Sequence, residues 1–180
     1  PDGGVEDDLI IYCLAEDDYM LVVNGACEAG DFAHISSQLP AGPTFSNISE
    51  ATGKIDLQGP RSFEVLKNLL GQDFVSPGYF NFTRAAWRGA ELIVSRTGYT
   101  GELGYEFYLD AARTPELWEA LAADALVKPV GLGARDTLRL EMGYPLYGQD
   151  LDTAHTPVEA GFGGLVAKQK PFTGDRKSVV

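Results

Sequence analysis

The stretch SRTGYTGELGYEF, residues 95–107, decides how this chain is interpreted. Glycine permits backbone angles that other residues avoid, and it lets a second backbone or a ligand approach closely. We therefore expect a tight turn between two strands at the three glycines, Gly98, Gly101 and Gly104, with room for a ligand to approach its backbone. A strand follows these glycines where a dinucleotide-binding GxGxxG motif would be followed by a helix, so that motif is a poor match.

Glu106 is the first candidate site residue, because it lies in the middle of an aromatic strand predicted over Tyr105–Leu109. Alternation places Glu106 and Tyr108 on one face and the other side chains on the opposite face. A carboxylate there costs free energy unless it is exposed or paired with a donor. The pattern alone favours an exposed strand face. The alternative is a binding site, since two adjacent acceptor oxygens match a ring with adjacent N–H donors, as in a pterin.

The rest of the chain predicts groups of strands followed by helices, which favours an α+β fold with mixed or antiparallel sheets and packed helices. We expect no short repeat. The predicted strands are 9–14 and 19–24, forming a hairpin, then 44–49, 51–58, 79–86 and 90–96, besides 105–109. The predicted helices are 28–39, 63–70, 114 to about 125 with Thr114 as N-cap, and 132–142, with connecting structure over 143–164.

Composition excludes several function classes. Twenty-six acidic against fourteen basic residues give a net charge of −12, which disfavours nucleic acid as a partner. Every apolar run is too short to span a membrane. His34 and His155 fall at no metal-ligand spacing with each other or with the cysteines, so we expect no metal site. We expect Cys13 and Cys27 to be reduced and buried.

Further candidates lie at two places in the chain. Arg135 follows the glycines that open the last predicted helix, where it either binds a ligand or pairs with an acid, and the pattern favours the ion pair. At the start of the first predicted strand, alternation puts Asp8 on one face with Tyr12. A similar parity brings Asn24 from the returning strand, so an acid, a phenol and an amide gather on one surface.

The whole chain resembles the aminomethyltransferase family, the T-protein of the glycine cleavage system. Five segments carry the resemblance in order and spacing, and together they cover the chain to about residue 171, which leaves 172–180 as a tail of uncertain structure. They are GGVEDDLIIY, SNISEATGKIDLQGP, SRTGYTGELGYEF, KPVGLGARDTLRLEMGYPLYGQDLD and TPVEAGFG.

The resemblance implies a folate-binding domain that transfers an aminomethyl group from the lipoylated H-protein to tetrahydrofolate, a co-substrate, without a metal. It implies that Asp8 is the catalytic aspartate beside the reacting folate nitrogens. It also implies that Glu106 grips the pterin, that Arg135 contacts substrate, and that Tyr99 lines the pocket. Tyr12 and Asn24 are carried over as further folate-binding residues. Reduced cysteines and the lack of a leader in the visible sequence predict the bacterial cytoplasm, or the mitochondrial matrix in a eukaryote.

Family members extend beyond both ends of this chain, so we expect a fragment with an incomplete cleft that binds folate weakly and catalyses little. Two other functions stay open. One is the folate domain of a dimethylglycine or sarcosine dehydrogenase-like enzyme. The other is a non-catalytic folate-binding protein of iron–sulfur cluster assembly, which the absence of cysteine from Tyr147–Asp150 argues against.

Overall fold

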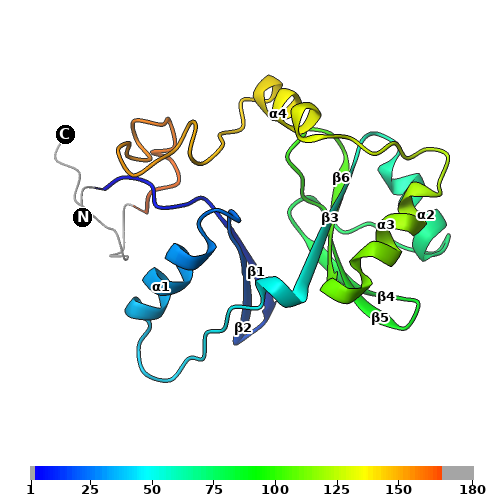
Figure 1. The fold of residues 1–180 in the computed structure, drawn as a ribbon, viewed down its shortest axis with the longest axis horizontal. Coiled ribbons are helices and arrows are strands. Elements are labelled where there is room, and N and C mark those ends of the chain that lie inside the picture. Colours follow the sequence, from blue (N-terminus) through cyan, green and yellow to red (C-terminus); the bar gives the residue numbers. More distant parts are fainter. Residues whose placement is uncertain (1–2, 168–180) are drawn as a thin grey trace. The chain divides into compact units, whose positions relative to one another are not determined.

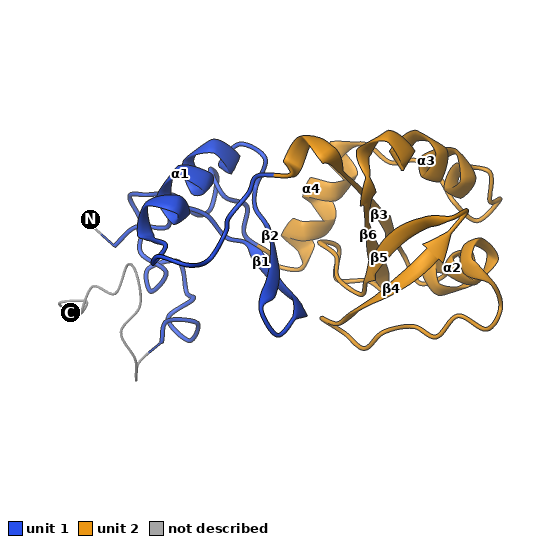
Figure 2. Cartoon of the chain, turned by 90° about the horizontal axis from the view of Figure 1, so that it is seen from below, with its two compact units in different colours: residues 1–47, 145–180 blue, residues 48–144 orange. Residues whose placement is uncertain are grey.

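The computed structural model describes residues 3–167 (Figure 1). The chain divides into two compact units, one of residues 1–47 and 145–180 and the other of residues 48–144 (Figure 2). Each unit is α+β, as predicted, because each combines antiparallel strands with helices. Within residues 3–167, no helix has the length and apolar character that a membrane span requires.

The unit of residues 48–144 contains a four-stranded antiparallel sheet in the order β3-β6-β5-β4. Its predicted strands are confirmed within three residues at each end. Their observed bounds are β3 Thr52–Gln58, β4 Phe82–Trp87, β5 Ala90–Ser95 and β6 Gly104–Asp110, and a short 3₁₀ helix, η1 Ser49–Ala51, precedes β3.

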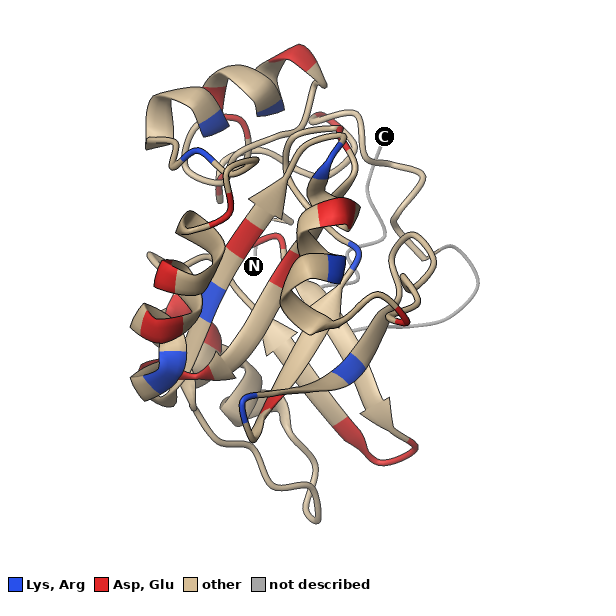
Figure 3. Ribbon diagram, turned by 90° about the vertical axis from the view of Figure 1, so that its right-hand side faces the viewer, with Lys and Arg blue, Asp and Glu red and all other residues tan. Residues whose placement is uncertain are grey.

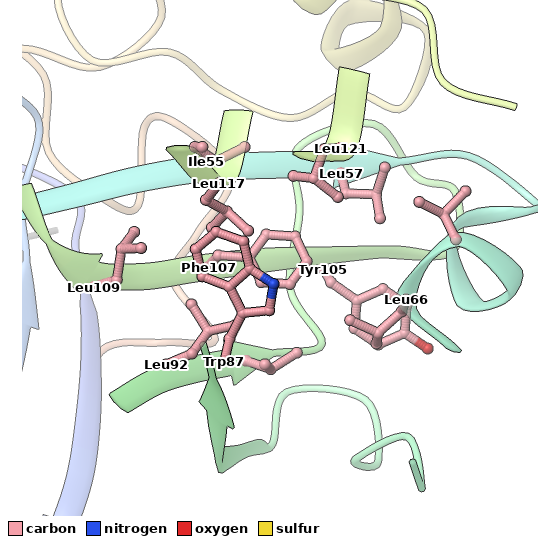
Figure 4. Packing of buried hydrophobic residues seen from close by; sticks show 12 residues of the cluster. Ile55, Leu57, Leu66, Trp87, Leu92, Tyr105, Phe107, Leu109, Leu117 and Leu121 are labelled. Atoms are coloured by element: carbon pink, nitrogen blue, oxygen red, sulfur yellow. The ribbon is translucent and has the colours of Figure 1, made fainter. Parts of the chain in front are cut away.

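The alternation predicted for β6 is confirmed. Tyr105, Phe107 and Leu109 belong to the core, where they pack with leucines of β3, β5 and two helices (Figure 4). Those helices are α2, Ser62–Leu70, and α3, Thr114–Ala122, which follows the 3₁₀ helix η2, Ala111–Arg113. Both helices therefore cover one face of the sheet and leave the face of Glu106 for other contacts.

The Thr114 cap was predicted wrongly. Arg113 occupies the N-cap position, and the buried Thr114 hydroxyl has no hydrogen-bond partner among the described residues. The reason is tertiary: Thr114 packs against β3, so closely that a Cβ on Gly53 would lie 1.6 Å from its Oγ1. The last helix, α4 Leu132–Glu141, forms as predicted.

The glycine turn between β5 and β6 works in two ways. Gly101 has a φ of +72°, which glycine adopts readily. Gly98 and Gly104 instead allow a close approach, because a Cβ at either position would lie 2.1 Å or 1.8 Å from the side-chain oxygen of Gln58. The Gln58 amide donates to the carbonyl of Thr97 at 3.2 Å and so ties the turn to β3.

The other unit opens with the predicted hairpin of β1, Ile10–Ala15, and β2, Asp18–Val22, followed by α1, Glu28–Gln38. The predicted strand over 44–49 is wrong: among the described residues this segment forms no strand, and its last residue begins η1. Side chains hold this segment to α1: Phe45 stacks on Phe32 with 5.2 Å between ring centres, and Asn47 donates to Glu28 at 2.6 Å. Residues 143–164 are connecting structure, as predicted, with an isolated bridge between Tyr147 and Leu151.

Candidate functional site

Glu106 is buried, with 4% of its surface exposed, so the exposed strand face that the pattern favoured is wrong. Its carboxylate accepts from three side chains. Lys54 Nζ lies 2.6 Å from one oxygen, and the hydroxyls of Thr97 and Tyr108 donate to the other. A buried carboxylate is tolerated when donors surround it in this way.

Strand pairing places a second carboxylate beside Glu106. Asp56 of β3 lies directly opposite Glu106 of β6 in the antiparallel register. Like charges in such a pair repel. Lys54 offsets this repulsion, because its Nζ also lies 3.5 Å from Asp56 Oδ1.

The ionisation of both acids reflects these neighbours. Burial opposes the ionisation of Glu106, but the charge of Lys54 and the hydrogen bonds from Lys54 and Thr97 outweigh it, so the pKa of Glu106 lies below its ordinary value. Burial raises the pKa of Asp56, and the charge of Glu106 acts in the same direction, against Lys54 and Arg135. Glu106 is therefore the carboxylate that stays ionised most readily.

Arg135 of α4 pairs with an acid, which is the interpretation that its sequence pattern favoured. Its guanidinium donates to Asp56 Oδ2 at 2.8 Å and lies 4.8 Å from the ring centre of Tyr99. Tyr99 in turn stacks on Tyr144, with 5.8 Å between ring centres. The side chain of Arg135 keeps 41% of its surface exposed, so the same cation remains available to a ligand.

Two hollows adjoin these residues within the unit of residues 48–144. A hollow of about 240 Å³ is lined by Thr97, the glycine turn and Tyr144. A groove of about 1100 Å³ runs along β3, the edge strand of the sheet, and its lining includes Lys54, Asp56 and Arg135. Glu106 lines neither hollow, and Lys54 connects it to the groove.

The other unit brings Asp8 and Asn24 together, as predicted. The Asn24 amide donates to a carboxylate oxygen of Asp8 and to its backbone carbonyl, both at 3.1 Å. It also donates to Asp7 at 2.7 Å, and the backbone N–H of Asn24 donates to the second oxygen of Asp7 at 3.0 Å. Asn24 thus orients both acids, and its hydrogen bonds to the Asp7 carboxylate are shorter and more numerous than the one to the Asp8 carboxylate.

Asp8 keeps contact with solvent, but protein atoms crowd its carboxyl group. This desolvation, together with the charge of Asp7, raises the pKa of Asp8, and the hydrogen bond from Asn24 opposes the rise. Tyr12 of β1, four residues further along the chain, is buried with 5% of its surface exposed. Asp31 of α1 is also buried; burial and Asp7 raise its pKa to about 6.

The cysteine prediction is right about the free thiols and wrong about their burial. Cys27 is only partly buried, and Cys13 is exposed, because it lies on the exposed face of β1. Among the described residues, no three acidic, histidine or cysteine side chains cluster as metal ligands would. Within residues 3–167, basic residues are scattered over helices, strands and loops and form no single stripe along the ribbon (Figure 3).

Sequence reasoning did not single out several residues around the predicted ones. In Lys54–Asp56, two charges flank an apolar residue within a strand, which is a signal that could have been used. Thr97 and Asp31 carry no comparable signal. The residues missed are Asp7, Asp31, Lys54, Asp56, Thr97 and Tyr144.

Comparison with known proteins decides the family. The model of the GCVT N-terminal domain matches residues 1–170. The chain belongs to this family. It is 44% identical to an aminomethyltransferase of Halothermothrix orenii over 97% of this chain and 50% of that protein. It is 45% identical to an aminomethyltransferase of Moorella thermoacetica over 99% of this chain and 50% of that protein.

A solved structure of an aminomethyltransferase supports the same family. The glycine cleavage system aminomethyltransferase T from Bartonella henselae superposes with a TM-score of 0.76 at 31% identity. The match covers 93% of this chain and 45% of that one. The chain thus spans about half the length of the curated relatives it matches, and their aminomethyltransferase names describe proteins about twice as long.

Proposed function

We propose that this chain carries a tetrahydrofolate site of a glycine cleavage T-protein, an aminomethyltransferase. The protein would accept an aminomethyl group on the lipoyl arm of the H-protein and transfer its carbon to tetrahydrofolate. The folate N5 attacks that carbon, the carbon–sulfur bond breaks, and ammonia leaves as the ring closes onto the second folate nitrogen. The products are methylenetetrahydrofolate, ammonia and the reduced dihydrolipoyl arm.

The observation that carries the proposal is the buried Glu106 carboxylate, kept ionised on a sheet face by side-chain donors. Two acceptor oxygens side by side suit the adjacent N–H donors of a pterin ring. Tyr99 and Arg135 offer a flat ring and a cation that a planar folate can contact. These features support a ligand with a neutral, hydrogen-bonding ring.

Asp8 is proposed as the catalytic residue, acting by orientation and electrostatics on the reacting folate nitrogens. Its hydrogen bond from Asn24 supports a fixed carboxylate position. Tyr12 and Asn24 are proposed to complete the folate surface of the same unit, Asn24 mainly by holding Asp8.

Calorimetry of this chain with tetrahydrofolate tests the binding assignment. Glu106→Gln removes the carboxylate charge and should weaken binding by roughly 10- to 100-fold, as expected when a charge-assisted hydrogen bond is lost. Glu119→Gln makes the same change on an exposed helix position and should leave the affinity unchanged. Equal affinity in the Glu106 and Glu119 variants would remove the basis of the proposal.

The catalytic assignment needs the complete transfer reaction with lipoylated H-protein. Asp8→Asn should lower turnover far more than it lowers folate affinity, because orientation acts on the reacting atoms. Asp17→Asn, in the hairpin turn, is the matched control. Full turnover by the Asp8 variant would exclude the catalytic role.

A further inference from the structure

We propose that Lys54 is a specificity residue that recognises the 4-oxo group of the pterin ring, next to the ring N–H groups that Glu106 accepts. This inference rests on the proposed folate function and adds a residue to it. The ring edge of a 2-amino-4-oxo pterin presents, in order, an acceptor, a donor and a donor. Lys54 and Glu106 present, side by side, a donor and two acceptors.

The first argument is geometric. Lys54 Nζ lies 2.6 Å from Glu106 Oε1, so an edge that binds the carboxylate places its neighbouring atom at the ammonium group. Lys54 is also the member of the pair that can be reached from outside, because its side chain is 35% exposed and lines the groove along β3, whereas the Glu106 side chain is 5% exposed. A ligand in the groove therefore meets Lys54 first.

The second argument concerns where the present donors of Glu106 go when a ligand takes their place. The Thr97 hydroxyl already lies 2.9 Å from the hydroxyl of Ser95. Lys54 has a reserve acceptor in Asp56 Oδ1, which is buried, makes no hydrogen bond among the described residues, and lies 3.5 Å from Nζ. Two of the three donors, Thr97 and Lys54, can therefore leave Glu106 without losing a partner, and Lys54 stays beside the ring.

The third argument is electrostatic. The charges of Asp56 and Glu106 raise the pKa of Lys54 although burial acts against them, so the side chain is an ammonium at neutral pH. An ammonium donates to a ring oxygen and repels a ring amino group. Lys54 should therefore favour a ring with an oxygen at position 4 over the same ring with an amino group there.

Folic acid and 4-amino-4-deoxyfolic acid are the probes: the second carries an amino group in place of the oxygen at position 4, and its neighbouring N3 bears no hydrogen. At about pH 8, where the diamino ring is neutral in solution, the chain should bind folic acid at least roughly tenfold more tightly, the loss expected for one charge-assisted hydrogen bond. Lys54→Met should lower this ratio several-fold, and the part that remains reflects the N3–H group that Glu106 accepts. Lys54→Arg keeps a charged donor and should preserve the ratio, as should Lys67→Met on α2, a residue that lines neither hollow.

The ratio of the two affinities is the measured quantity, because partial unfolding of a variant lowers both affinities by the same factor. An unchanged ratio in Lys54→Met overturns the inference and leaves the folate function intact, provided that Glu106→Gln still weakens folic acid. Absence of binding to either probe by the unmodified chain overturns the folate function itself.

Guanosine presents the same acceptor–donor–donor edge on a different ring system. If guanosine binds tightly in a Lys54-dependent way and folic acid does not bind, the site recognises this ring edge in a purine, and the proposal of a pterin ligand is overturned. Folic acid binding in the presence of excess guanosine supports the pterin.

Discussion

A methyl group added at Gly104 should loosen the glycine turn by displacing Gln58. The two residues are direct partners across β3 and β6, and a Cβ at position 104 would lie 1.8 Å from Gln58 Oε1 and 2.3 Å from its Cδ. The amide must therefore leave its bonds to the Thr97 carbonyl and the Thr100 hydroxyl, each 3.2 Å long. At about 1 kcal/mol each, these bonds are worth roughly 2 kcal/mol.

Gly104→Ala should nevertheless cost only about 1–1.5 kcal/mol, since alanine is better than glycine within a strand by about 0.5–1 kcal/mol. Urea unfolding measures this cost, and a double-mutant cycle with Gln58→Ala isolates its cause. In the Gln58→Ala background, the alanine should become neutral or stabilising. Gly133→Ala is the control, because a Cβ there would meet no described heavy atom within 4 Å apart from its chain neighbours and the backbone of its own helix. An equal cost of Gly104→Ala in both backgrounds would refute the displacement of Gln58.

Three further predictions concern titration, reactivity and packing. The pKa of Asp31 is raised from 3.8 to about 6, so its ionisation destabilises the fold as pH rises through that range. Asp31→Asn should therefore add about 1–2 kcal/mol to the unfolding free energy near pH 7.5 and nothing near pH 4. An equal gain at both pH values would contradict this prediction. A thiol reagent near pH 7.5 should label the exposed Cys13 first, because burial raises the pKa of Cys27 to about 11; Cys13→Ser should leave only the slow phase. Phe107→Ala should cost about 3–5 kcal/mol by urea unfolding, since the ring is wholly buried in the core.

Sequence patterns predicted the fold correctly where an alternating or helical pattern of apolar residues has another strand or helix to pack against. The alternation in β6 was sufficient because the core covers the face of Tyr105 and Phe107. Segment 44–49 also carries an aromatic and β-branched residues, but among the described residues no strand forms there, and Phe45 stacks on Phe32 of α1 instead. Strand propensity shows that a segment fits a sheet; it does not show that a neighbouring strand is present.

The candidate site was less accessible from sequence, because its chemistry depends on pairing across the sheet. Nothing local to Glu106 shows that Asp56 lies opposite or that Lys54 reaches its carboxylate. The acid that pairs with Arg135 lies 79 residues away along the chain. The pairing of Asp8 with Asn24 was predictable, since one hairpin register decides it.

The charges around Glu106 limit what the site can take. Lys54 and Arg135 balance Asp56 and Glu106, so the ionised cluster has no net charge. A cationic ligand would add a third positive charge and an anionic one a third negative charge, each partly desolvated at a cost of several kcal/mol. A neutral ring brings N–H donors and an oxygen without that cost, and Asp56 Oδ1 receives the displaced ammonium. The cluster therefore suits a neutral, hydrogen-bonding heterocycle better than an ion.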